Sequence, residues 1–467
     1  MLDALREILG PNAVLSGDDT VKWRSDWTDS YHCTPLAVVR PKTTHDVSAV
    51  VQWANGTGTP IVPVGGNTGL SGGTFADGAV MISLDRLNQI EEVRPQSRVA
   101  IVGAGVILSN LHEAVDAHDL VFPLTFGAKG SAMIGGILST NAGGSNVVRY
   151  GNTRDLCLGI EAVLPTGEII NLMSELHKDN SGLNLKHLLI GAEGTLGLIT
   201  RAVLKLHPKP RAFATAMLAA KDLDAGLDVL NALQQATGGA VEAFEYMPRA
   251  YIDAHRAMFP AAPAPFADSY DVNILAEVGA LAPRDARMMQ DGSTPVVTHL
   301  EDTLAGFIEN GLILDAVVAQ NEGQRRAMWE RREQAAEVVL TQGPVIQNDV
   351  ALPLDRLQEF LTKASQVLAT IDPEAHDISV AHVGDGNIHY TVSPSDTDPA
   401  HKDKIVEAIE KLVQDMRGSF SAEHGIGLSK RNSMKRRKDP IALNTMKAIK
   451  EALDPNGILN PGKVYPD

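Results

Sequence analysis

The sequence predicts a mixed helix-and-sheet (α+β) protein of two or three domains. The chain has 467 residues, and a domain takes about 150. Up to about residue 210 it is rich in glycine, with short aliphatic runs between turns, which is typical of strands and loops. From Arg211 to about Gly343, alanine and charged residues increase and apolar residues recur at helical spacing, so a second domain begins there.

Composition excludes several classes of protein. Hydrophobic residues make up 44% of the chain, yet no apolar run approaches the ~18 residues that span a bilayer. The first residues, MLDALREILG, lack the features of a secretion signal, and Cys33 and Cys157 are too few for a disulfide framework. We therefore expect a soluble, cytoplasmic protein. The net charge of −16, without a basic stripe, argues against a nucleic-acid partner.

The first elements predict a β-α-β start that ends in a glycine loop. Apolar residues within 47–54 have helical spacing, and PIVPV at 60–64 reads as a strand. PVGGNTGLSGG, residues 63–73, follows with five glycines, which permit positive φ and let backbone N–H groups converge on an anion. A side chain at Gly66 or Gly69 is expected to occupy the volume that a phosphate needs. The loop matches neither G-x-G-x-x-G nor a Walker A pattern.

Two further glycine runs follow in the same domain. They are GAKGSAMIGGILSTNAGGSNVVRYG at 127–151 and GAEGTLGLIT at 191–200. A tight turn explains one such loop, but three loops in one domain indicate one large ligand.

The second domain contains three segments with helical periodicity, at residues 303–313, 325–340 and 354–371. The last of these carries an apolar stripe that is explained by packing alone. The chain then ends in DPNGILNPGKVYP, residues 454–466, whose turn-rich composition is typical of an ordered tail that docks on another part of the protein.

Two histidines lie on a predicted hairpin, in HVGDGNIH at 382–389. Asp385-Gly386 is a strong two-residue turn, and pairing about it places residues whose numbers sum to 771 opposite one another. His382 then faces His389, with the Cβ atoms about 5 Å apart. In one unbroken strand, residues seven apart point to opposite faces. The hairpin therefore predicts a pair of imidazoles that can bind one metal ion, and stacked or solvated histidines are the alternative.

A third ligand for such an ion is available in SAEHGIG, residues 421–427. Glu423 and two imidazoles would make a three-ligand site with open positions for a substrate. Strict strand alternation aims Glu423 and His424 apart, so both can serve one site only if the chain bends locally. Gly425 permits that bend.

The glycine loops, taken in order with LGIEAVLPTGEII at 158–170, resemble the FAD-binding domain of the vanillyl-alcohol oxidase flavoprotein superfamily, also called PCMH-type. The resemblance implies non-covalent FAD, because the first loop holds no histidine, tyrosine or cysteine. It further implies the following cofactor-binding residues: Gly65, Gly66, Asn67, Thr68, Gly69, Gly72, Gly130, Ser131, Gly135, Gly136, Asn141, Gly143, Gly144, Glu193, Gly194, Ile199 and Asn460.

The C-terminal motifs AHVGDGNIHYTV, SAEHGIGLSKR and LDPNGILNPGKV resemble the D-2-hydroxy-acid dehydrogenases of that superfamily, of the D-2-hydroxyglutarate and D-lactate dehydrogenase type. The resemblance implies that His382, His389 and Glu423 hold a zinc or manganese ion and that His424 is the general base. It also implies an electron-transfer flavoprotein or a quinone as electron acceptor, and it leaves the oligomeric state, a homodimer included, open.

The resemblance places substrate contacts at Arg332, Gln347, Thr391 and His382, although Arg332 is equally explained as a solvated helix charge. In the D-2-hydroxyglutarate pattern Gln347 is a lysine and Thr391 an asparagine, so D-lactate stays an alternative substrate.

The implied architecture is a two-subdomain α+β FAD-binding domain (1–210), an α/β substrate-binding domain (211–420) and a C-terminal segment (421–467) that returns to the flavin. The predicted reaction is oxidation of a D-2-hydroxy acid to the 2-oxo acid. A zinc hydrolase that uses the same histidines and a non-catalytic flavin-binding protein are the alternatives.

Overall fold

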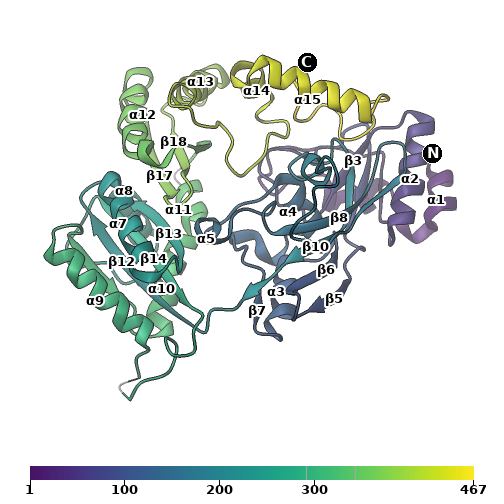
Figure 1. Cartoon of the computed structure of the whole chain (residues 1–467). Coiled ribbons are helices and arrows are strands. Elements are labelled where there is room, and N and C mark those ends of the chain that lie inside the picture. Colours follow the sequence, from purple (N-terminus) through teal and green to yellow (C-terminus); the bar gives the residue numbers. More distant parts are fainter. Residues whose placement is uncertain (291, 342, 467) are drawn as a thin grey trace. The chain divides into compact units, whose positions relative to one another are not determined.

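The computed structural model describes residues 1–290, 292–341 and 343–466, which fall into two compact units (Figure 1). The C-terminal segment belongs to the first unit, and a short piece of the second glycine run belongs to the second. Unit 1 comprises Met1–Gly143, Gly151–Pro208 and Glu423–Asp467, and unit 2 comprises Gly144–Tyr150 and Lys209–Ala422.

Unit 1 contains a small mixed sheet and a larger antiparallel one. The small sheet has the order β1 (Val14–Leu15), β2 (Ala37–Val39), β4 (Val80–Ser83) and β3 (Ile61–Val64), with β2, β4 and β3 parallel. The larger has the order β5 (Ile90–Arg94), β6 (Val99–Gly103), β10 (Leu198–Lys205), β8 (Cys157–Val163) and β9 (Ile169–Leu172). A two-stranded ladder joins β7 (Leu120–Val121) to β11 (His207–Pro208).

The predicted helix in the β-α-β start is α2 (Thr44–Thr57), and its ends have clear causes. Thr43 and Asp46 form a capping box, and Gly58 ends the helix in a left-handed conformation. The apolar face of α2 packs with β3 and β4 in one buried cluster. The other helices of unit 1 are α1 (Leu2–Leu9), α3 (Leu108–Asp116), α4 (Ile134–Thr140), α6 (Lys186–Leu189), α14 (Arg431–Arg437) and α15 (Pro440–Leu453).

The C-terminal tail docks on β3. The N–H of Ile61 donates to the carbonyl of Ile458, and the N–H of Asn460 donates to the carbonyl of Ile61, each at 2.7 Å. Ile458 and Leu459 are buried in the same cluster as α2. The last strand-like residues therefore complete the core that the first hundred residues begin.

Unit 2 is built on a seven-stranded antiparallel sheet. Its order is β15 (Asp315–Val318), β12 (Ala212–Ala220), β14 (Val272–Ala280), β13 (Val241–Pro248), β17 (His376–His382), β18 (Asn387–Ser393) and β16 (Ile346–Ala351). Residues 144–150 add the short helix α5 (Val147–Tyr150), whose Arg149 and Tyr150 contact Glu242 of β13.

Helices cover both faces of this sheet. One face packs against α7 (Leu223–Thr237), α9 (Pro295–Glu309), α12 (Leu357–Ile371) and α13 (Pro399–Asp415). The other packs against α8 (Arg249–Met258), α10 (Glu322–Glu333) and α11 (Ala335–Leu340). The predicted helix at 325–340 is thus two helices, which meet at Gln334. Among the described residues, no helix combines the length and apolar character needed to cross a membrane.

Candidate active site

The predicted histidine hairpin is present as β17 and β18, but its register differs from the prediction. His382 lies opposite Asn387, and His389 lies opposite Val380, so paired residue numbers sum to 769 rather than 771. The prediction of a two-residue turn is wrong, because the carbonyl of His382 accepts the N–H groups of both Asp385 and Gly386 and closes a four-residue loop. A shift of two residues leaves every side chain on its expected face.

His382 and His389 are therefore diagonal neighbours on one face of the sheet. Their ring centroids are 5.4 Å apart and the rings are nearly perpendicular. The alternating residues Ile388 and Tyr390 pack into the opposite face. Both imidazoles thus face the side covered by α8, α10 and α11.

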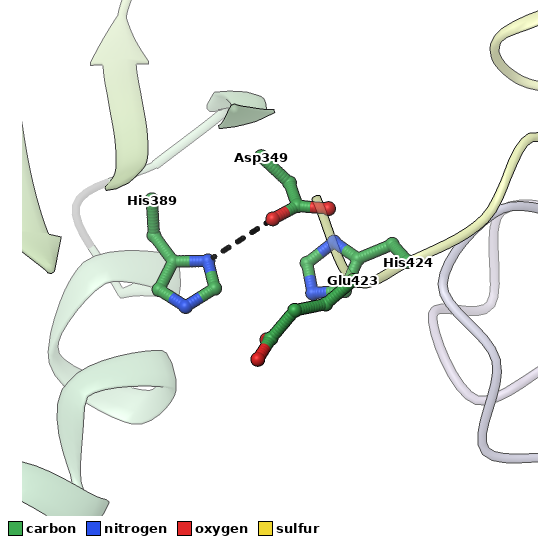
Figure 2. Close-up of side chains that lie close together, drawn as sticks. All are labelled: Asp349, His389, Glu423 and His424. Carbon is green, nitrogen blue, oxygen red and sulfur yellow. Dashed lines mark ion pairs between the residues drawn. The ribbon is translucent and has the colours of Figure 1, made fainter. Parts of the chain in front are cut away.

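A carboxylate accompanies each histidine in unit 2. Asp349 of β16 is paired with His389, and its Oδ1 lies 3.8 Å from His389 Nδ1 (dashed line in Figure 2). Asn387 Nδ2 donates to the same Asp349 oxygen at 2.8 Å. On the neighbouring strand, Glu245 Oε1 lies 2.8 Å from His382 Nδ1. At this hydrogen-bond distance the Glu245 carboxylate can fix the tautomer and orientation of the His382 imidazole.

Glu245 also binds Arg332, the residue predicted to contact a substrate carboxylate. Its Oε2 lies 2.8 Å from Arg332 Nε, and the Glu245 side chain is 1% exposed. Burial acts to raise the pKa of Glu245, but attraction to His382 and Arg332 outweighs it and lowers the pKa below the usual value. Arg332 is itself buried, and its Nη2 has no hydrogen-bond partner among the described residues. A buried guanidinium nitrogen of this kind is suited to an anionic ligand.

The other two residues predicted to bind substrate lie on the same face. Thr391 is buried and is paired with the exposed Gln347 of β16, two positions along from the His389–Asp349 pair. Unit 2 therefore brings together Arg332, His382, His389, Thr391 and Gln347 on one side of one sheet.

Glu423 and His424 begin the C-terminal stretch of unit 1. Residues 422–424 form bends rather than a strand, and Gly425 has a φ of +70°. Ser71 of the first glycine loop donates its Oγ to the carbonyl of His424 at 2.9 Å. Glu423 and His424, like Asp349 and His389 of unit 2 (all labelled in Figure 2), each offer a nitrogen or carboxylate oxygen of a type that binds metal ions.

The residues predicted to bind FAD lie in unit 1, with Gly144 at the start of unit 2. A Cβ at Gly66 would come within 2.0 Å of the carbonyl oxygen of Ser131, so the first and second glycine runs touch there. The backbone of Ser131 is therefore a reason for glycine at position 66 in addition to the phosphate that the sequence predicts there. At Gly69, Gly130 and Gly136, by contrast, a Cβ would meet no described atom within 4 Å, so these glycines border open space.

Other members of this set line or support the same loops. A Cβ at Gly65 would contact Met133, one at Gly135 would meet Ala104, and one at Gly143 would lie 2.7 Å from Glu423 Oε1. Asn460 Nδ2 donates to the carbonyls of Gly73 and Glu193, while its Oδ1 is buried and without a partner among the described residues. Of the remainder, Asn67 donates to Ser25 and Asn141 ends α4, while Gly72 and Gly194 have positive φ and Ile199 lies in β10.

Glu193 behaves differently from a residue that contacts a cofactor through its side chain. Its carboxylate oxygens accept the backbone N–H groups of Ile426 and Gly427, at 2.7 and 2.8 Å. Burial raises the pKa of Glu193, and these two donors oppose that rise.

The glycine loops as a whole fit a large dinucleotide. Glycines 69, 130 and 136 border open space, and the buried Asn460 oxygen offers an acceptor.

Sequence reasoning missed Asp349 and Glu245. Asp349 stands in the strand-like IQNDVA at 346–351, where an acidic residue at the end of the polar run 347–349 was a usable signal. Glu245 stands in the fully buried strand VEAFEYMP at 241–248, where a second acidic residue was the signal. In both cases the identity of the partner depends on strand order, which local patterns do not contain.

Comparison with known proteins assigns the chain to a class. Residues 209–464 match the family model of the C-terminal domain of FAD linked oxidases, and residues 35–173 match that of an FAD binding domain. The chain belongs to the FAD-linked oxidases and is an FAD-linked oxidoreductase. This confirms the predicted family and enzyme class and does not favour a zinc hydrolase.

Individual relatives and a solved structure are similar to this chain over nearly its whole length. The chain is 33% identical to the D-2-hydroxyglutarate dehydrogenase of Stutzerimonas stutzeri (strain A1501), covering 100% of this chain and 98% of the relative. It is 33% identical to the mitochondrial D-2-hydroxyglutarate dehydrogenase of Arabidopsis thaliana, covering 99% and 80%. A crystal structure of p-cresol methylhydroxylase with substrate bound superposes with a TM-score of 0.75 at 17% identity, covering 100% of this chain and 96% of that one. This likeness confirms the predicted mixed helix-and-sheet flavoprotein fold.

Proposed function

We propose that this enzyme oxidises a D-2-hydroxy acid, with D-2-hydroxyglutarate as the first candidate, to the 2-oxo acid. Unit 1 binds FAD and unit 2 contributes the substrate face in this proposal. The observation that carries it is the buried row Arg332–Glu245–His382, with His389 beside it, because it sets an unpartnered guanidinium nitrogen close to a pair of imidazoles. The names of the full-length relatives support the same substrate.

A divalent cation, zinc or manganese, is part of the proposal. His382, His389 and Glu423 are the proposed ligands, and Asp349 is a further oxygen donor. Chain continuity supports the participation of Glu423: the N–H of Ala422 donates to the carbonyl of Asp349 at 3.2 Å, and Glu423 is the next residue, one Cα step of about 3.8 Å along the chain. Imidazole and carboxylate donors suit zinc and manganese.

Each side chain has a defined task in this reaction. Arg332 and Thr391 orient the substrate, and Gln347 lies at its distal end. His424 takes the proton of the hydroxyl group, a task to which an imidazole is suited. Bound FAD would supply the hydride acceptor for this oxidation, and a bound cation would supply a Lewis acid that favours loss of the hydroxyl proton.

The electron acceptor and the cellular location belong to the same proposal. We propose an electron-transfer flavoprotein or a quinone as acceptor, as the resemblance to the FAD-linked D-2-hydroxy-acid dehydrogenases implies. We propose a cytoplasmic location, because Cys33 and Cys157 are both free and buried, as in a reducing compartment.

The experiment is anaerobic mixing of the yellow holoenzyme with D-2-hydroxyglutarate, its L-enantiomer, D-lactate and glycerol. We expect the D-hydroxy acids alone to bleach the flavin. His424→Ala should keep flavin and metal and reduce the flavin about 10²–10⁴-fold more slowly, whereas His389→Ala should release metal, measured by elemental analysis. Bleaching by neither D-acid would refute the proposal, and loss of metal from the His424 variant alone would exchange the two roles.

A further inference from the structure

The loop from Glu423 to Leu428 is held by unit 1 through its backbone. It contains two residues with positive φ, Gly425 at +70° and Gly427 at +49°. The carbonyl of His424 accepts from Ser71 Oγ at 2.9 Å, and the N–H of Leu428 donates to the carbonyl of Ser71 at 2.8 Å. Ser71 therefore holds the loop at two points, four residues apart.

Glu193 holds the same loop between those points. Its Oε1 accepts the N–H of Ile426 at 2.7 Å and its Oε2 accepts the N–H of Gly427 at 2.8 Å. Both oxygens of one carboxylate are thus committed to consecutive amides, and hydrogen bonds to a charged acceptor are stronger than neutral ones. These amides begin two residues after His424.

The glycines of the loop are required for this approach. A Cβ at Gly425 would lie 2.8 Å from Glu193 Oε1, and a Cβ at Gly427 would lie 2.0 Å from the carbonyl oxygen of Ser71. The EHGIG pattern therefore serves the fit of the loop onto Glu193 and Ser71 as well as the bend that lets Glu423 and His424 serve one site.

Glu193 itself occupies a strained conformation that its surroundings maintain. Its φ is +51°, which is costly for a residue with a side chain. Its N–H donates to the carbonyl of Ser139 and its carbonyl accepts Asn460 Nδ2, both at 2.8 Å. Strain of this kind persists where the position of a side chain matters.

We infer that Glu193 is a positioning residue, whose carboxylate sets the placement of Glu423 and His424 through the amides of Ile426 and Gly427. This inference rests on the proposed function for the roles of Glu423 and His424. It differs from the assignment of the Glu193 side chain to cofactor binding. If that side chain held FAD, its replacement would release FAD, whereas the inference predicts that FAD stays bound.

The test compares Glu193→Gln with Glu161→Gln in the holoenzyme. Glu161 is also a buried glutamate of unit 1, but its partners are Thr44 and Arg201, away from the loop. In Glu193→Gln one oxygen becomes an NH₂ group that cannot accept. We expect FAD to stay stoichiometric, exchange of the Ile426 and Gly427 amides to accelerate at least about tenfold, and Zn²⁺ affinity and kcat to fall about 10–100-fold with KM little changed. Glu161→Gln should lower thermal stability but leave FAD content, amide exchange, Zn²⁺ affinity and kcat unchanged.

Two milder variants keep the test decisive if Glu193→Gln folds poorly. Glu193→Asp retains the charge and should recover part of the slow exchange, and Ser71→Ala should accelerate exchange without touching the carboxylate. Loss of FAD with unchanged amide exchange would overturn the inference in favour of a cofactor contact, and equal behaviour of both glutamine variants would reduce Glu193 to a structural role. If the wild-type enzyme oxidises no 2-hydroxy acid, the proposed function fails, while exchange and FAD content still decide the inference.

Discussion

On the face of unit 2 that we propose binds substrate, single residues would decide what the distal end of a substrate meets. Gln347 is exposed and lies opposite Thr391, in the row next to His389 and Asp349. Arg332 is a buried cation on this face, and Glu245 already neutralises part of its charge. A diacid substrate therefore gains from a further positive charge at position 347, whereas a monoacid does not.

We predict that Gln347→Lys shifts preference from D-lactate towards D-2-hydroxyglutarate. A hydrogen bond to a charged group contributes roughly 1.5–3 kcal/mol, which corresponds to about a ten- to hundredfold change in the ratio of kcat/KM values. The measurement is kcat/KM for both acids with a dye acceptor, and Gln347→Met is the size-matched control without charge. An unchanged ratio in the lysine variant would place Gln347 away from the distal end of the substrate.

At the scale of elements, α10 is held on the sheet by two buried ion pairs. Near its start, Arg325 Nε and Nη2 bind both oxygens of Glu277 on β14, at 2.8 and 2.9 Å. Near its end, Arg332 binds Glu245 on the adjacent strand β13. Trp329 Nε1 and Thr215 Oγ1 also donate to Glu277, so the first pair is well satisfied. The helix thereby places Arg332 beside Glu245, which in turn binds His382.

We predict that Arg325→Met destabilises the protein and raises KM for the hydroxy acid more than it lowers kcat. The substitution leaves the Glu277 carboxylate buried without its main counter-charge, which costs about 3 kcal/mol, and it loosens the helix that positions Arg332. Arg326→Met is the matched control, because Arg326 is the next residue of the helix and its side chain is exposed. Thermal unfolding and steady-state kinetics measure the two effects, and a loss of stability with unchanged KM would separate this anchor from substrate binding.

At the scale of the whole molecule, unit 1 depends on a C-terminal tail that closes onto the first glycine loop. Lys463 Nζ donates to the carbonyl of Phe75 at 2.6 Å and to that of Pro461 at 3.1 Å. Burial lowers the pKa of Lys463 from 10.5 to about 8. The unfolded chain therefore keeps this proton up to a higher pH than the folded one.

We predict that Lys463 makes the protein more stable as pH rises through this window. Between about pH 8 and 10.5 the unfolded state binds more protons at this position, so the free energy of unfolding should increase by up to about 3 kcal/mol. Urea unfolding of the holoenzyme at about pH 7.5 and pH 10 measures this change in the free energy of unfolding. The proteins compared are the wild type, Lys463→Met and, as a control, Lys178→Met, whose lysine is exposed. The wild type and the control should gain stability relative to Lys463→Met, and parallel pH profiles for all three would contradict the prediction.

Local patterns in the sequence determined the parts of the protein that depend on near neighbours. Helix α2, the break before β3, the glycine loops and the strands of the histidine hairpin all follow from spacing within about fifteen residues. The hairpin register was predicted two positions off, because the turn closes on the carbonyl of His382 rather than on Asp385-Gly386 alone. Its face was nevertheless predicted correctly, since side-chain alternation has a period of two.

Only the tertiary structure decided which polar groups meet. His382 pairs with Glu245, 137 residues away, and the amide of Gly427 binds Glu193, 234 residues away. The join at Gln334 likewise reflects a bond to His255 of α8, which no helical periodicity contains. Such partners depend on strand order and on the packing of elements that are distant in the chain. That packing decides which residue pairs with a buried charge. The sequence by itself therefore determined the cofactor class and the face of the site, whereas the network that orients the site exists only in the folded chain.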